Sequence, residues 1–469
     1  VELVNLISNN PTNLFLTGGW SLNNTLQVNV GTLDVSGADS LVLLSNSTKT
    51  AEILESNGSF VGDFTLQRFI SARNANYSNI AAPISNATVA SIDDDVAISG
   101  VGGRFGNVSA NPGGGIFYSM FEYDRSDNNK LDSIQSTAAA LAPGVGYELY
   151  LFTTLGSFAE TTLDYVGTPN FGNITPPSIL SGFNLVGNPY FCHLDRAQLD
   201  NSNISPTIYI FNSSTGVYTT LGANKIAPGQ GFWVDNTSGG TVPFNFDEGD
   251  KAADGSSIFL RKKGSKEFSL ELSNDVNYFK NKISMSFDYS ATEGMDQFDA
   301  RFLPSPMNNA SELYFTTITK DKLTKNTLNQ LEESHVVPLE LKIGEVGTYT
   351  INSANISSIL DNYSCVYLSD EATKESIDLS VENDYTFEAE SGVSERFKLV
   401  VSNSFEACEK ALNAADLNQK IDDRLKLRES YGNWFLDYNL GENTETLVIS
   451  VYGMNGQQIL QKMELNLSQ

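Results

Sequence analysis

Clusters of acidic side chains are the residues of this sequence whose types and spacing best suit chemistry. Calcium takes roughly six to eight oxygen ligands, mostly carboxylates and carbonyls. Three short stretches hold several carboxylates each, and none has the spacing of an EF-hand loop. We consider all three as candidate calcium sites, with a solvated turn as the alternative interpretation: Asp93, Asp94 and Asp95 in the first stretch, Asp124, Asp127 and Asp132 in the second, and Asp247, Glu248, Asp250 and Asp254 in the third.

Histidine and cysteine are scarce. His193 and His335 are the only histidines and lie far apart in sequence, so neither a three-histidine zinc site nor a His-Glu-x-x-His motif is present. His193 follows Cys192 directly, and a hydrogen-bonded histidine is the simpler interpretation of that pair. Cys365 and Cys408 could form one disulfide, which the sequence leaves open.

The common catalytic motifs are missing as well. There is no Gly-x-Ser-x-Gly elbow, and the glycine-rich stretch from Gly100 to Gly106 lacks the Lys-Ser/Thr ending of a phosphate loop. We therefore expect no catalytic residues and no enzymatic activity in this chain. We also expect no bound cofactor other than calcium.

The charge balance narrows the class of partner. The chain has 56 acidic and 29 basic residues, for a net charge of -27. Nucleic-acid binding needs basic patches that neutralise phosphates, so we expect no nucleic-acid partner. Hydrophobic residues make up 40% of the chain, enough for packed cores, while the 18% of charged residues is below the usual ~25%.

The elements that must position these residues are strands. Runs of four to eight residues alternate apolar and polar side chains, and turn residues separate them throughout the chain. Asn57-Gly58 and Asn455-Gly456 match the two-residue turns of β-hairpins. The pattern predicts an all-β protein of tandem antiparallel β-sandwiches of the jelly-roll or immunoglobulin-like type.

At 469 residues the chain is too long for a single core, which predicts several domains. Its start carries short apolar runs in Asn- and Gly-rich sequence, like the last rungs of a β-solenoid. An acidic stretch around Asp247-Glu-Gly-Asp250 reads as a surface loop or linker. We divide the chain into a β-rich stalk or solenoid-like segment (1–65), a duplicated β-sandwich (66–250), a second β-sandwich (257–402), a linker or helix (403–430) and a strand-rich C-terminal segment (431–469).

The duplication rests on repeated motifs in the same order. Ala142-Pro-Gly-Val-Gly-Tyr147 is echoed by Ala227-Pro-Gly-Gln-Gly-Phe232, and Tyr118-Ser-Met-Phe121 by Tyr209-Ile-Phe211. Pro-Gly is typical of a tight turn that leads into the next strand. We predict that both turns occupy equivalent positions in one sandwich, with Tyr147 and Phe232 pointing inward.

The C-terminal segment holds the most specific residues. Val448-Ile-Ser-Val-Tyr-Gly-Met-Asn-Gly-Gln-Gln-Ile-Leu460 resembles the strand–turn–strand signature of the type A sorting domain of type 9 secretion cargo from Bacteroidetes. Upstream stretches such as Glu293-Gly-Met-Asp-Gln-Phe-Asp-Ala300 resemble modules that precede this domain in large surface proteins. The usual Pro-Asn-Pro start and the closing Gly-x-Tyr strand are not found, so the resemblance is to a partial sorting domain.

This resemblance implies an exported protein that is secreted, extracellular or displayed at the outer membrane. It implies roles such as adhesion or gliding motility, and as partners the type 9 translocon and an outer-membrane shuttle barrel. A surface polysaccharide or a substratum would be the adhesive target. The residues that would contact the export machinery are Val451, Tyr452, Gly453, Asn455 and Gly456.

A second interpretation is a carbohydrate-binding accessory region of a secreted polysaccharide-degrading enzyme. Such a region needs aromatic side chains on an exposed sheet face or in a cleft. The candidates are Trp20, Tyr147, Tyr150 and Trp233.

Overall fold

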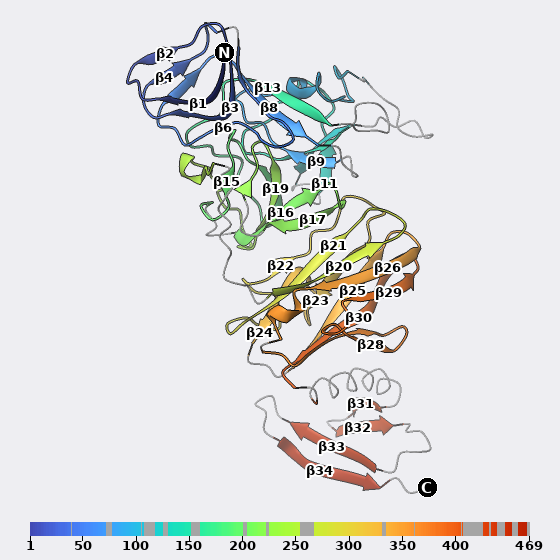
Figure 1. Cartoon of the computed structure of the whole chain (residues 1–469). Helices are drawn as coiled ribbons and strands as arrows, with labels where there is room; N and C mark the ends of the chain where they lie inside the picture. Colours follow the sequence, from blue (N-terminus) through green and yellow to red (C-terminus); the bar gives the residue numbers. More distant parts are fainter. Residues whose placement is uncertain are drawn as a thin grey trace.

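The chain is nearly all β, as the sequence predicts, and its units follow one another along the molecule (Figure 1). No helix within the described residues is both long and apolar enough to cross a bilayer. Beyond residue 406 only backbone strands are described. The structure, a computed structural model, describes residues 1–38, 40–71, 77–104, 106, 118–124, 130–151, 160–199, 204–221, 225–253, 267–330, 334–360, 362–404, 406, 425–430, 433–438, 446–452 and 458–466.

The first unit is a short β-solenoid. Strands β1, β3, β5 and β8 pair in parallel as one sheet, and β2, β4 and β7 pair in parallel as a second. Each turn of the chain therefore adds one strand to both sheets. The strands are β1 (Glu2–Ser8), β2 (Asn13–Phe15), β3 (Gly19–Val28), β4 (Thr32–Asp34), β5 (Ser40–Leu43), β6 (Glu52–Ile53), β7 (Ser59–Val61) and β8 (Phe64–Ile70).

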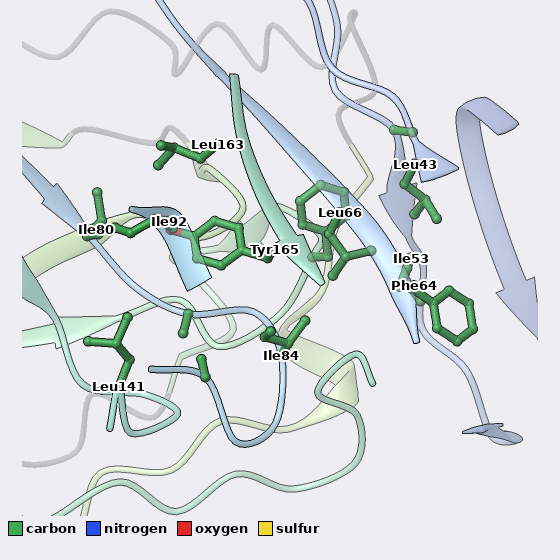
Figure 2. Packing of buried hydrophobic residues seen from close by; sticks show 14 of the residues in the cluster. Leu43, Ile53, Phe64, Leu66, Ile80, Ile84, Ile92, Leu141, Leu163 and Tyr165 are labelled. Atoms are coloured by element: carbon green, nitrogen blue, oxygen red, sulfur yellow. The ribbon is translucent and has the colours of Figure 1, made fainter. Parts of the chain in front are cut away.

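A stack of leucines runs through this solenoid. Leu3, Leu22, Leu43 and Leu66 are in register on successive parallel strands, and the last three are fully buried. Each stacked side chain covers the one before it and, together with buried side chains of the second sheet such as Leu33 and Phe60, this removes apolar surface from water. Leu66 is in turn in register with Tyr165, so the stack continues into the next unit (Figure 2).

Two details of the sequence analysis are wrong here. Asn57-Gly58 does not close a hairpin, because β6 pairs with β3 while β7 pairs with β4, in the other sheet. The solenoid also extends past residue 65, since β8 runs to Ile70 and β13 pairs with it in antiparallel fashion. That pairing covers the edge of the last rung.

The second unit contains two four-stranded antiparallel sheets with the same topology. One has the order β11-β10-β12-β9, and the other has the order β17-β16-β19-β14. Its elements are β9 (Tyr77–Ile80), η1 (Val89–Ile92), β10 (Met120–Asp124), β11 (Lys130–Ser133), β12 (Tyr147–Tyr150), β13 (Thr161–Gly167), β14 (Gly182–Gly187), β15 (Leu194–Asp195), β16 (Ile204–Asn212), β17 (Val217–Leu221), β18 (Lys225–Ile226), β19 (Gly231–Asn236) and η2 (Glu248–Asp250).

The two Pro-Gly turns occupy equivalent places in these sheets. Gly144 and Gly229 have φ of 79° and 62°, and each sits at the third position of a turn closed by a backbone hydrogen bond of 3.2 Å. This is the type II turn that requires glycine there. Each turn leads into a central strand, and the aromatic residues at the start of those strands, Tyr147 and Phe232, are 2% and 0% exposed.

The two halves contact each other through matched backbone groups. Val145 bridges to Val186, and in the equivalent contact Gln230 bridges to Ile80. The following residues, Gly187 and Ala81, donate backbone hydrogen bonds to equivalent glycine carbonyls in the opposite turns. The halves are therefore related by an approximate two-fold axis. A Cβ on Gly187 would lie 2.3 Å from the Cβ of Ala81, so this interface has room for only one of the two methyl groups.

We expect Gly187→Ala to destabilise this unit by about 1–3 kcal/mol, because the added methyl group overpacks a closed interface. Adding Ala81→Gly should recover only part of the loss, since the Val145 carbonyl oxygen lies 2.6 Å from the same point. The control is Gly240→Ala, where nothing lies within 4 Å. Urea denaturation followed by tryptophan fluorescence measures the free energy of unfolding. Equal stability of Gly187→Ala and Gly240→Ala would contradict this prediction.

The third unit is a β-sandwich whose strands form one continuous, nearly closed sheet. All neighbouring strands pair in antiparallel fashion except β21 and β24, which are parallel. Its main core is an apolar cluster that includes Phe268, Leu313 and Phe397. The elements are β20 (Glu267–Asn274), β21 (Asn281–Asp288), β22 (Ala300–Arg301), β23 (Glu312–Thr316), β24 (Lys322–Asn329), β25 (Ser334–Ile343), β26 (Gly347–Ala354), η3 (Ile356–Ser358), β27 (Cys365–Asp370), β28 (Glu375–Asp378), β29 (Asp384–Ala389) and β30 (Gly392–Ser402).

The C-terminal part contains two antiparallel hairpins. β31 (Leu425–Ser430) pairs with β32 (Asn433–Tyr438), and β33 (Thr446–Tyr452) pairs with β34 (Gln458–Asn466). The sequence allowed a helix up to residue 430; its last part is wrong, because Leu425 begins a strand. Residues 407–424 lie outside the described part of the chain.

A cleft between two units as the candidate site

The candidate site lies where the second half of the duplicated unit meets the third unit. The Tyr209 hydroxyl on β16 donates a 2.7 Å hydrogen bond to the backbone carbonyl of Arg301, and the Arg301 guanidinium lies 3.6 Å from Asp235 on β19. Ser305 donates a further 2.6 Å bond to the Gly216 carbonyl. These contacts join the two units directly, and two pockets lie at this junction, one mainly polar and one mainly aromatic. We call the junction the cleft and the two pockets its polar end and its aromatic end.

The polar end is a pocket of about 910 Å³. Its lining combines carboxylates, hydroxyls, an amide and a guanidinium with a few apolar side chains. Mixed linings of this kind, with a few polar groups among apolar ones, are typical of small-molecule sites. The pocket is lined by Ile204, Ser205, Pro206, Asp235, Thr237, Ser238, Met295, Asp296, Gln297, Phe298, Asp299 and Arg301.

Charges in the polar pocket are mainly negative. Asp235 is 1% exposed and faces Arg301, the one cation among the lining residues. Burial raises the pKa of Asp299 to about 6, although backbone amides of Thr327 and Asp296 oppose the shift. At neutral pH the three aspartates outweigh the single arginine.

The loop at residues 292–299 forms one wall of the polar pocket, and hydrogen bonds within the loop fix its backbone. Asp296 accepts hydrogen bonds from the amides of Thr292 and Phe298, and Asp299 accepts one from the amide of Asp296. A second bond, from the Thr327 amide on β24, ties Asp299 to the sheet. The loop therefore presents Gln297 and Phe298 from a fixed backbone.

The aromatic end is a second pocket, of about 470 Å³. Tyr123 and Trp233 meet edge to face with ring centroids 4.5 Å apart, and Tyr218 lies 5.8 Å from Trp233 on the other side. Burial raises the pKa of the Tyr218 hydroxyl well above its usual value. The lining residues are Tyr123, Leu131, Ser181, Gly182, Phe183, Tyr218, Trp233, Leu303, Pro304 and Pro306.

Of the aromatic candidates, only Trp233 reaches the cleft. Tyr147 is buried in the core on the other face of β12. Tyr150 packs edge to face against Tyr77. Trp20 lies in the solenoid, where its indole donates to the Thr17 carbonyl.

Two carboxylates of the first calcium candidate accept hydrogen bonds from nearby backbone amides. Asp93 accepts hydrogen bonds from the amides of Ile98 and Arg104, at 2.9–3.0 Å. Asp95 accepts one from Asp164, and burial raises its pKa to about 6. The Asp94 carbonyl accepts a bond from the Arg104 guanidinium. These contacts give Asp93 and Asp95 a structural role in the loop.

The second calcium candidate lies on a hairpin. Asp124 is in register with Lys130, and Asp132 with Glu122. Asp127 lies outside the described residues. Among the residues that are described, no group of three or more His, Cys, Asp or Glu side chains is arranged to hold a metal ion.

The acidic stretch at 247–250 forms hydrogen bonds that connect the solenoid with the duplicated unit, so it is not a free linker. Asp247 caps the single-turn helix η2 by accepting from the Gly249 amide. The Glu248 carboxylate accepts from the amides of Ser56 and Gly172, at 2.9 and 2.8 Å, and pairs with Lys251. Glu248 thus ties the solenoid to the duplicated unit, which the sequence interpretation missed.

Both histidines pair with carboxylates. His193 contacts Glu52, and His335 contacts Glu293 at 3.1 Å, which lowers the pKa of the Glu293 carboxyl.

The Cys192 thiol is free and buried, and burial raises its pKa. Cys365 is disulfide-bonded.

The export-related residues are only partly described. Val451 and Tyr452 lie at the end of β33, where they pair with Leu460 and Gln458 of β34. Gly453, Asn455 and Gly456 fall between the two strands, outside the described residues.

Comparison with known proteins adds a single match. No curated protein and no solved structure matches the chain. Residues 198–401 are similar to a domain of unknown function (DUF8693), a span that runs from β16 to β30 and contains every lining residue of the polar pocket.

Proposed function

We propose that the chain is a surface-displayed structural or adhesive protein, exported by the type 9 route, with its C-terminal segment as the export signal. The observation that carries the proposal is the hairpin of β33 and β34. Its strands coincide with the two strand portions of the resembling motif, and residues 453–457 connect them. An exposed hairpin edge is a surface to which a partner's sheet can add.

Two further features support this proposal. Direct contacts fasten the solenoid, the duplicated unit and the third unit to one another, as a stalk requires. The disulfide at Cys365 suits an oxidising compartment outside the cytoplasm. The third unit and the duplicated unit would then hold the C-terminal segment away from the solenoid (Figure 1).

The test is the export of a Gly456→Val variant of the full gene product in its native host. Asn-Gly turns need positive φ, which valine disfavours, and a register slip of one residue would turn Leu447, Ile449 and Val451 to the opposite face. We expect secreted protein to fall at least tenfold while the upstream units still fold. Immunoblots of cells and medium measure it.

The matched control is Gly240→Val, in an upstream loop with open space around it. It should be exported like the wild type. Wild-type export of the Gly456 variant would reject the sorting role and leave a small hairpin module that only ends the stalk.

The second candidate function is a carbohydrate-binding region of a secreted polysaccharide-degrading enzyme. The observation that favours it is the cleft, with aromatic rings at one end and hydrogen-bonding side chains at the other. Release of reducing sugar by the full gene product would favour this enzyme-linked role over the adhesive one.

A further inference from the structure

The polar pocket between the two units lies outside the C-terminal segment to which we assign export, so its chemistry needs a separate explanation. Its walls come from three stretches that are distant in sequence: residues 204–206, 235–238 and 295–301. The Tyr209–Arg301 hydrogen bond and the Asp235–Arg301 contact fix these walls relative to one another. A pocket that is already formed loses little entropy when a ligand binds.

The lining chemistry matches a polyhydroxylated ligand. The Asp296 carboxylate can accept hydrogen bonds from hydroxyl groups, while Arg301 can donate them and Gln297 can do both. Phe298 adds a flat apolar surface on the same wall. Sugar rings carry hydroxyls around their rim and C–H groups on their faces, so they need both kinds of contact.

The charges exclude an anionic ligand. Three aspartates face the pocket against a single arginine, and the whole chain carries a net charge of -27. Phosphate, sulfate or uronate groups would meet repulsion there.

A cation is disfavoured for a different reason. Asp296 and Asp299 already accept backbone amides, and Asp235 faces Arg301. No three carboxylates in the described part of the chain come together as a metal site.

From these observations we propose that the polar pocket binds a neutral oligosaccharide. The ligand's hydroxyls bond to Asp296, Gln297 and Arg301, and one sugar face lies on Phe298. This inference goes beyond export and rests on the same cleft as the second candidate function, to which it gives a ligand class. It concerns the purified chain whether or not the C-terminal segment is a sorting signal.

The experiment is isothermal titration calorimetry on the full chain. The probes are neutral hexasaccharides of β-1,4-glucose, β-1,4-xylose, β-1,4-mannose, α-1,4-glucose and β-1,3-glucose, with hexagalacturonate and a hexalysine peptide as charged probes. We expect at least one neutral hexasaccharide to bind with a Kd below 1 mM. We expect both charged probes to bind at least tenfold more weakly than it does.

Variants locate the binding in the pocket. Phe298→Ala should weaken it at least tenfold, and Gln297→Ala, at an exposed position of the same loop, at least threefold. The matched control is Tyr289→Ala, which removes an aromatic ring that is 64% exposed and outside the pocket, and it should leave Kd unchanged. Circular dichroism verifies that each variant is folded.

Salt distinguishes the neutral ligand from a charged one. Binding of the neutral sugar should change less than twofold between 50 and 500 mM NaCl, whereas an ionic ligand would lose affinity steeply. The proposal is overturned if no neutral hexasaccharide binds below 1 mM, if hexalysine or hexagalacturonate binds more tightly, or if Gln297→Ala and Phe298→Ala both bind like the wild type.

Discussion

Replacing Arg396 by Met is expected to lower the free energy of unfolding of the third unit by about 3–5 kcal/mol, because it leaves a buried carboxylate without its cation. Asp370 is fully buried, and the Arg396 guanidinium bonds to both of its oxygens at 2.6–3.0 Å. Arg396 also donates to the Glu388 carbonyl on β29, and Tyr385 on the same strand donates to Asp370. This network joins β27, β30 and β29 where the sheet nearly closes.

The pH dependence of this network follows from the Asp370 carboxyl. Burial alone would raise its pKa, but hydrogen bonds from Arg396, Tyr385 and the Ala372 amide outweigh burial and lower it. Its contribution is therefore present above the pKa of the unfolded chain and is lost as pH falls through the lowered folded value.

Two variants separate this network from ordinary surface pairs. Lys320→Met breaks the exposed pair with Glu395, next to Arg396 in sequence, and should cost less than about 1 kcal/mol. Combining Arg396→Met with Asp370→Leu should recover most of the loss, because no buried charge remains. Urea titration with pulsed hydrogen exchange of β27 and β30 peptides measures all three. A double variant no more stable than Arg396→Met alone would contradict this account.

The sequence predicted the strands and the duplication because both depend on local patterns. Alternation of apolar residues is a property of each strand alone, and a Pro-Gly pair favours a type II turn because glycine accepts the positive φ at the third position. Tyr147 and Phe232 could therefore be assigned to the core from their places after those turns.

What the sequence could not provide are contacts between distant segments. The leucine stack has no strict period, because loops of different length separate Leu3, Leu22, Leu43 and Leu66. The polar pocket exists only once β16, β19 and the loop at 295–301 are brought together. Acidic clusters are ambiguous for a related reason: composition does not tell whether a carboxylate such as Asp93 holds an ion or accepts backbone amides.

Glu148→Gln is expected to make the duplicated unit more stable by about 3 kcal/mol at pH 8, and to change little at pH 4. Glu148 is 2% exposed on β12, and burial raises the pKa of its carboxyl to about 7, against an opposing effect of the Asn79 side chain. One pKa unit corresponds to about 1.4 kcal/mol. In the unfolded chain the carboxyl has its ordinary pKa near 4.3.

The sign follows from proton binding. Between pH ~4 and ~7 the folded state keeps a proton that the unfolded chain has lost, so wild-type stability falls as pH rises and the full penalty is present above the folded pKa. Glutamine has the shape of the protonated acid and cannot ionise, so the variant should lose this part of the slope. The control is Glu160→Gln, directly before β13, an exposed side chain whose removal should leave the slope unchanged. Urea denaturation at several pH values, followed by tryptophan fluorescence, compares the three proteins. The prediction fails if the free energies of unfolding of the wild type and Glu148→Gln change with pH in the same way from pH 4 to 8. The buried carboxyl would then ionise at little cost, and the neighbouring Tyr77 and Tyr218 would lie in a more polar environment than their burial indicates.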